Sequence, residues 1–375
     1  MTNNTPPLQN QEDRTDVNVR KPRNSNLELY RIMCMLMIVA HHYVVNSGLN
    51  DSGGPLLLYP ESINSVFLNV FGMWGKVGIN CFMMITGYYM CTSQITFKKM
   101  LKLVLQVYLY KLLIFPVFLF AGYETITFEK ILKLIMPVWG FTNNFTSCFI
   151  VFYLTIPFLT ILVKNMTKRQ HQILLILLLF CYTILGSVPR FDVSFNYITW
   201  FGVIFLLASY IRLYPTQLFE RRVLWKWMTL ATALFAMGSV VIMEHMFGKG
   251  YFFVVDSNKF FAVLFAVCSF LWFKNIRMNH SKIINAFGAS TFGVLLIHAN
   301  SDAMRRWLWK DTVDCIGHYD LPIGQLVIYS VVVVFAVFII CNLIDQIRIL
   351  LMEKPFFRWY DKHHGERMQR LFGFE

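Results

Sequence analysis

Charged residues are scarce in this chain of 375 residues, where Asp, Glu, Lys and Arg together make up 15%. A soluble domain carries roughly 25%, so this scarcity excludes an ordinary water-soluble protein. Hydrophobic residues reach 56%, and apolar stretches of about 20 residues recur, the length that crosses a hydrocarbon core of roughly 30 Å. Lipid leaves free backbone groups without partners, so these stretches must be helices. We predict an all-α, polytopic integral membrane protein.

Other features are missing as well. The first apolar stretch is too long for a cleavable signal peptide and lacks a small-x-small cleavage site. Most of the eight cysteines fall inside predicted spans, so they form neither a disulfide framework nor a metal-ligand spacing. No internal repeat is evident, which counts against inverted-repeat transporter folds. No loop or tail is long enough to hold a soluble domain.

About ten transmembrane helices are predicted, at residues 27–48, 66–90, 103–122, 147–163, 172–188, 197–211, 227–243, 253–273, 284–299 and 323–344. Basic residues concentrate on cytoplasmic loops, and most of them fall here on the side of the N-terminal tail. The opposite loops carry only Lys130, Lys133, Arg190, Lys249, Arg305, Arg306 and Lys310. Both termini are therefore expected in the cytoplasm, and topology explains the net charge of +13 without nucleic acid.

The two ends of the chain differ from the apolar middle. Residues 1–26 are rich in Asn, Pro and charge, which predicts a disordered cytoplasmic tail. Residues 351–375 mix aromatic and basic side chains. Such a segment lies along the inner membrane face or extends into solvent as a tail.

The first span holds several ionisable groups, although such groups are costly within a bilayer. Arg31 and His42 are eleven residues apart, so they share one helix face about 16 Å apart along the axis. Glu28 lies on that face one turn before Arg31, and His41 is rotated by about 80°. Ionisable groups inside spans are functional candidates by default. The alternatives are a snorkelling anchor for Arg31 and a bond to a neighbouring helix for His42.

These residues resemble the first-helix motif of the membrane acyltransferase 3 family, in which ten residues separate an arginine from a histidine. Glu28-Leu29-Tyr30-Arg31 is similar to the acid-x-x-Arg opening of that motif. Phe82 followed by Thr86-Gly87-Tyr88 resembles the family's aromatic residue and Ser-Gly-Phe. Lys99-Met100-Leu101-Lys102 stands where many members have Arg-x-x-Arg, and His298 matches a histidine that ends the ninth span. The resemblance covers about residues 27–350 and defines an expected ten-helix membrane domain.

The resemblance implies an enzyme of the bacterial cytoplasmic membrane that transfers an acyl group, usually acetyl, from cytoplasmic coenzyme A to a hydroxyl of a cell-envelope glycan. Acetyl-CoA is a co-substrate, and no tightly bound cofactor or metal is expected. A base is needed because a hydroxyl is a poor nucleophile. We assign that role to His42, as a base or a transient acyl carrier, with Arg31 binding a phosphate or the thioester carbonyl.

Further residues receive binding roles. Lys98, Lys99 and Lys102 are expected to bind the phosphates of coenzyme A, although the positive-inside rule alone predicts lysines there. Thr86 and Gly87 approach the acyl chain, or the glycine serves helix packing. The residues expected to contact the acceptor are His41, Glu28, Tyr88, His298 and Asn300.

Other polar and aromatic residues leave their roles open. Lys76 and Lys111 line a cavity or snorkel, and Trp139 and Trp200 anchor the interface or stack on sugar. The rival functions are a transporter or flippase, which would not depend on acetyl-CoA, and an accessory membrane protein, which would tolerate His42→Ala.

Overall fold

The structure is a computed structural model that describes residues 23–136, 138–139, 144–191 and 193–369, with side chains up to residue 363. Most of the N-terminal tail predicted as disordered, residues 1–22, and the last residues, 370–375, lie outside the described residues. The described part contains helices and no strand, which confirms the all-α prediction. The first helix begins at Ser25 and the last helix is Lys354–Gln369.

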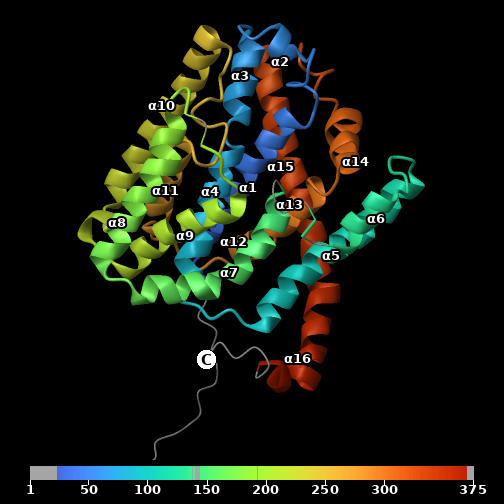
Figure 1. Ribbon diagram of the computed structural model, residues 1–375. Coiled ribbons are helices and arrows are strands. Elements are labelled where there is room, and N and C mark those ends of the chain that lie inside the picture. Colours follow the sequence, from blue (N-terminus) through green and yellow to red (C-terminus); the bar gives the residue numbers. More distant parts are fainter. Residues whose placement is uncertain (1–22, 137, 140–143, 192, 370–375) are drawn as a thin grey trace, which may run out of the picture.

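The helices follow one another in a single bundle (Figure 1). Their bounds are α1 Ser25–Val45, α2 Pro55–Leu58, α3 Ile63–Gly72, α4 Gly75–Met90, α5 Phe97–Phe120, α6 Phe128–Ile135, α7 Phe145–Asn165, α8 Lys168–Leu179, η1 Phe180–Ile184, η2 Leu185–Ser187, α9 Tyr197–Leu213, η3 Gln217–Glu220, α10 Arg222–Phe247, α11 Phe260–Lys274, α12 Lys282–Ala289, α13 Thr291–His298, α14 Asp302–Arg305, η4 Arg306–Thr312, α15 Ile323–Arg348, η5 Ile349–Glu353 and α16 Lys354–Gln369.

Seven helical segments of the described chain are long and apolar enough to cross a bilayer, and the bent pair α12–α13 with α14–η4 makes up to eight. The apolar helices α9 and α11 are shorter, at 17 and 15 residues. Each of the ten predicted spans falls on one of these segments. The multi-pass membrane architecture is confirmed, while the count of ten and the cytoplasmic termini stay predictions.

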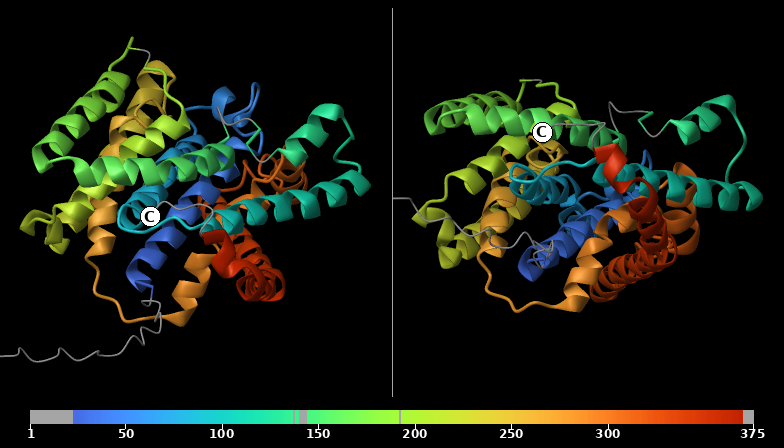
Figure 2. Two further views of the ribbon diagram at one scale, coloured as in Figure 1. Left: turned by 60° about the horizontal axis from the view of Figure 1, so that its bottom comes forward. Right: turned by 90° about the horizontal axis from the view of Figure 1, so that it is seen from below.

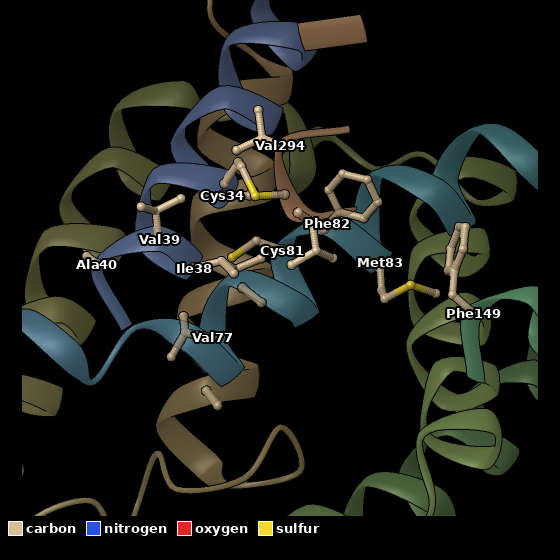
Figure 3. Packing of buried hydrophobic residues seen from close by; sticks show 14 of the residues in the cluster. Cys34, Ile38, Val39, Ala40, Val77, Cys81, Phe82, Met83, Phe149 and Val294 are labelled. Carbon is tan, nitrogen blue, oxygen red and sulfur yellow. The ribbon is translucent and has the colours of Figure 1, made fainter. Parts of the chain in front are cut away.

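Helix α1 occupies the middle of the bundle, in contact with α3, α4, α11, α12, α13 and α15 (Figure 2). Its contact with α4 is apolar, and Figure 3 shows Cys34 and Ile38 of α1 close to Val77 and Cys81 of α4. These small and medium side chains are fully or almost fully buried, which lets the two helices approach closely. Because α1 packs against six other helices, most of its length is in contact with protein.

One pair of helices stands apart from the bundle. Helix α6 folds back over the C-terminal half of α5, and both project to one side (Figure 2). Lys111 of α5 donates to the carbonyl oxygen of Lys133 on α6 at 3.1 Å, and the Tyr108 hydroxyl donates to that of Ile135. None of the α6 residues is buried. Helix α6 therefore lies beside the bundle and is attached to it mainly through α5.

Candidate functional site

A cavity of about 1000 Å³ opens at the end of the bundle where α1 finishes. We call it the His42 cavity; its lining includes His41, His42, Lys76, Lys111, Asn300 and Arg305. Ile38, Ile79 and Val107 line it one helical turn nearer the other end of the bundle. The cavity therefore combines a polar opening with an apolar interior part, between α1, α4, α5, α6, α7 and α13.

Two histidines meet at this cavity. The Nδ1 atom of His42 lies 2.9 Å from the Nε2 atom of His298, and the Nδ1 atom of His298 lies 2.6 Å from the Val294 carbonyl oxygen. A carbonyl only accepts, so His298 carries its proton on Nδ1. In the neutral pair His298 then accepts at Nε2 from the Nδ1–H of His42. This arrangement leaves the lone pair of His42 Nε2 free for another partner.

Local structure fixes both rings. His42 is in the last turn of α1, flanked by the buried side chains of Val39 and Tyr43. His298 is the final residue of α13, has no exposed surface, and lies edge-on to Trp309 with ring centroids 6.4 Å apart. The amide of Asn300 donates to the Leu296 carbonyl at 2.9 Å and so closes the end of that helix. His298 thus ends the helix of the predicted ninth span and contacts His42, while Asn300 follows the helix and lines the same cavity.

His41 also faces the cavity but has a different partner. Its Nδ1 lies 2.6 Å from the carbonyl oxygen of Gly72, which fixes the proton on Nδ1. The ring packs over Gly75 so closely that a Cβ atom at that position would lie 2.2 Å from the ring carbons. The start of α4 therefore requires glycine if His41 is to keep this orientation.

Arg31 and Glu28 lie toward the other end of α1. Arg31 is 3.6 Å from Glu28, whose carboxylate also meets Arg23 at 3.4 Å. The Oε2 atom of Glu28 is buried and has no hydrogen-bond partner. Eleven helical residues keep Arg31 about 16 Å from His42 along the axis. The two residues thus share a helix, as predicted, without acting on the same atom.

The three lysines predicted to bind phosphate have partners within the protein. Lys98 lies 2.6 Å from Asp361 of α16, Lys102 lies 2.5 Å from Glu353, and Lys99 donates to the carbonyl oxygen of Gln94 at 2.6 Å. To bind a phosphate, Lys98 would have to leave Asp361 and Lys102 would have to leave Glu353. The role itself stays a prediction.

The motif Thr86-Gly87-Tyr88 lies within α4, away from the lining of the His42 cavity. Thr86 donates to the carbonyl oxygen of Phe82 in its own helix at 3.1 Å. A Cβ atom on Gly87 would lie 2.9 Å from the Ala208 side chain and 3.0 Å from Phe205, so α9 packs directly on this glycine. Helix packing accounts for the glycine without a ligand.

Tyr88 has polar and aromatic neighbours of its own. Its hydroxyl accepts from Arg212 at 2.9 Å, and the guanidinium lies 4.8 Å from the ring centroid. Trp200 is fully buried and donates to Asn80 at 2.9 Å, so it is neither an interface anchor nor a sugar platform. Trp139 lines the His42 cavity.

Sequence reasoning missed a buried network between α5 and α15. One carboxylate oxygen of Asp345 accepts from Tyr110 and from Arg348 at 2.7 Å, and Gln106 adds a contact at 3.3 Å. Arg348 continues to Glu353 at 2.8 Å. The predicted span stopped at residue 344, one residue before this acid, although an acid so close to a span is itself a signal.

The group in this cavity that is available to accept a proton is the Nε2 atom of His42. Within the described ranges no three His, Cys, Asp or Glu side chains converge as a metal site requires. His42 offers a free imidazole nitrogen to the cavity, and His298 holds its tautomer. A nucleophile or base held by a second, orienting group is the arrangement that group-transfer sites use to activate hydroxyls.

Residues 24–343 match a family model described as an acyltransferase domain, the acyltransferase 3 family. The match covers most of the chain. No curated protein and no solved structure gave a match.

Proposed function

The chain belongs to the acyltransferase 3 family, and on that premise we propose that it transfers an acyl group, acetyl in the first instance, from acyl-CoA to a hydroxyl of a cell-envelope carbohydrate. The observation that carries this proposal is the His42–His298 pair at the wall of the His42 cavity. The donor is a co-substrate and not a resident cofactor.

The transfer follows from the free nitrogen of His42. Its Nε2 takes the proton of the acceptor hydroxyl while the oxygen attacks the thioester carbonyl carbon. The tetrahedral intermediate collapses, the carbon–sulfur bond breaks, and the protonated imidazole returns the proton to the leaving thiolate. His298 accepts a hydrogen bond from Nδ1–H of His42 in every step, and it therefore acts as a positioning residue.

The donor approaches from the end of the bundle that carries Arg31, Lys98, Lys99 and Lys102. That end faces the cytoplasm in this proposal, and these cations bind the phosphates of coenzyme A. The thioester then reaches His42 along the apolar part of the cavity beside Ile38, Ile79 and Val107. Arg31 is too far from His42 to contact the same carbonyl, so we assign it to the phosphates, with Glu28 orienting its guanidinium.

The acceptor enters from the opposite, outer side of a bacterial cytoplasmic membrane. His41 and Asn300 line the cavity beside the reacting centre and contact the sugar. Thr86, Gly87 and Tyr88 lie outside the lining of the His42 cavity and contact other parts of the protein, so this proposal gives them no ligand.

The test uses the full chain in lipid vesicles with acetyl-CoA labelled in its acetyl group and an extract of cell-envelope glycan. We expect glycan-dependent transfer of label in the wild type and its loss in His42→Ala. The matched control is His245→Ala, which removes an exposed histidine at the end of α10.

Each other result has a meaning. Label recovered on His42 without glycan would make this residue an acyl carrier. Binding of acetyl-CoA by neither protein, together with glycan uptake into the vesicles, would replace the enzyme with a transporter. Undiminished transfer by His42→Ala would show that His42 is not the catalytic base.

A further inference from the structure

The His42 cavity is lined by more positive than negative side chains. The acids in its lining are Glu124, Glu129 and Asp302, and each is paired with a lining cation, at 2.6 Å to Lys130, 2.6 Å to Lys133 and 2.9 Å to Arg305. Among the described residues Lys76 and Lys111 have no carboxylate within 4 Å. Both cations therefore add uncompensated charge to the lining.

Lys76 and Lys111 keep donors free. Lys76 donates to the Tyr197 hydroxyl, and Lys111 donates to the Lys133 carbonyl at 3.1 Å, whereas an ammonium group has three hydrogens. The guanidinium of Arg305 is a third cation here, and its buried Nε atom has no hydrogen-bond partner. Lys76 of α4 and Lys111 of α5 thus line one space with unused donors, and Arg305 of α14, paired with Asp302, lines the same space.

The positive charge of Lys76 raises the free energy of the protein at this position unless an anion lies nearby. Lys76 is the second residue of α4, where the helix dipole already presents partial positive charge. It also lies beside Gly75, which packs against the ring of His41. Lysine within a membrane protein at such a place is expensive and marks a site for a substrate or ion. A negatively charged group in the cavity offsets the helix dipole and both lysines together.

We propose that the acceptor carbohydrate is anionic, and that Lys76, Lys111 and Arg305 bind a phosphate or carboxylate that it carries near the reacting hydroxyl. This inference rests on the proposed acyl transfer to a carbohydrate. It adds the chemical class of the acceptor, because neutral sugars need no cation beside the base.

The donor is a poorer source of the anion. The phosphates of acyl-CoA are separated from the thioester by the pantetheine arm, and the thioester must reach His42. Lys76 follows Gly75, on which the ring of His41 packs, and it lines the same cavity as His42. A carboxylate or phosphate bound by Lys76 therefore belongs to the acceptor, whose hydroxyl His42 deprotonates.

The experiment measures binding separately from transfer. The full chain in lipid nanodiscs is titrated with a neutral oligomer of N-acetylglucosamine, with the same oligomer oxidised to carry uronates, and with a polyol phosphate chain. We expect one or both anionic chains to bind at least about tenfold more tightly than the neutral oligomer, a difference of about 1.4 kcal/mol. In Lys76→Gln with Lys111→Gln this preference falls toward unity.

The control variant combines Lys249→Gln and Lys310→Gln. It removes two positive charges from the same end of the protein, outside the lining of the cavity. We expect it to keep the preference for the anionic chain. Its result separates a local site from the general attraction of a basic surface.

Several results overturn the proposal. Equal binding of all three chains by the wild type does so, as does a preference that survives in the double variant. Weaker acetyl-CoA binding in the double variant, with the glycan preference kept, assigns the cations to the donor. Tighter binding of succinyl-CoA than of acetyl-CoA by the wild type, lost in the double variant while all three chains bind equally, assigns the cations to the acyl group. If the anionic chain binds as expected but no label is transferred from acetyl-CoA to any chain, the acyltransferase function fails while the anion site stands.

Discussion

The Nδ1 atom of His42 and the Nε2 atom of His298 are 2.9 Å apart, although 256 positions separate the two residues in the chain. The contact joins the last turn of α1 to the last residue of α13. Because His298 is buried and bonded to Val294, it presents only an acceptor to His42. The position of α13 therefore fixes which nitrogen of His42 faces the cavity.

Replacing His298 tests this relationship. We expect His298→Ala to lower kcat by about 10²-fold or more, because His42 loses the partner that holds its tautomer. The KM for acetyl-CoA should stay close to that of the wild type, since our proposal places the coenzyme A phosphates at the other end of the bundle. His298→Gln keeps both an acceptor and a donor, so it retains more activity than His298→Ala. Equal activity of the two variants, or a changed KM with normal kcat, would contradict the positioning role.

Adding one methyl group at Gly75 tests the packing of His41. A Cβ atom there lies 2.2 Å from the ring carbons, so Gly75→Ala must move the ring or the start of α4. We expect acyl transfer to fall about tenfold or more, because a shift of about 1 Å near the chemistry is costly. The control is Gly202→Ala, where a Cβ atom meets nothing within 4 Å. Full activity of Gly75→Ala would show that the orientation of His41 is unimportant.

The ion pair between Lys98 and Asp361 competes with donor phosphate in our proposal. Both side chains are partly exposed, so the pair is worth only about 0–1 kcal/mol. We expect Asp361→Asn to tighten acetyl-CoA binding by up to about fivefold, and Lys98→Gln to weaken it. Titration of acetyl-CoA into the reconstituted protein measures both effects. Asp320→Asn, an exposed acid outside this pair, is the control, and unchanged affinity in both test variants would separate Lys98 from the donor.

The buried Asp345 network contributes to stability. Asp345→Ala removes the 2.7 Å partner of the Arg348 guanidinium, which is only 7% exposed and then keeps Glu353 alone, and it removes the acceptor of Tyr110. Removal of one member of a buried ion pair costs about 3–5 kcal/mol, so we expect a clearly lower unfolding midpoint in detergent. Combining Asp345→Leu with Arg348→Met removes both charges and restores much of the loss. A single variant as stable as the double variant would contradict a coupled pair.

Local sequence was enough for much of the helical plan. Scarce charge and long apolar stretches predict spanning helices because a bilayer leaves the backbone no other way to satisfy its hydrogen bonds. Arg31 and His42 could be placed on one face of one helix because helical geometry depends only on spacing. The site prediction was weaker where a motif is also a packing element. Gly87 illustrates this, since the side of α4 that meets α9 could not be read from α4 alone.

Residues that act through distant partners were harder to predict. Lys98 and Lys102 are recognisable as cationic, but their pairing with Asp361 and Glu353 depends on where α16 and η5 return to α5. Asp345 was missed because the predicted span ended at residue 344, and its partner Tyr110 lies on α5, which only the fold brings to within hydrogen-bond distance.

The sequence by itself determined that this chain forms membrane helices, that it belongs to the acyltransferase 3 family, and that α1 carries an arginine and a histidine on one face. These properties follow from composition, motif and helical period, which need no knowledge of neighbours. Only the tertiary structure decided that His298 holds His42 and that Lys76 and Lys111 share its cavity. Hydrogen bonds and charge interactions act over a few ångströms, so they are set by which helices pack together and not by distance along the chain.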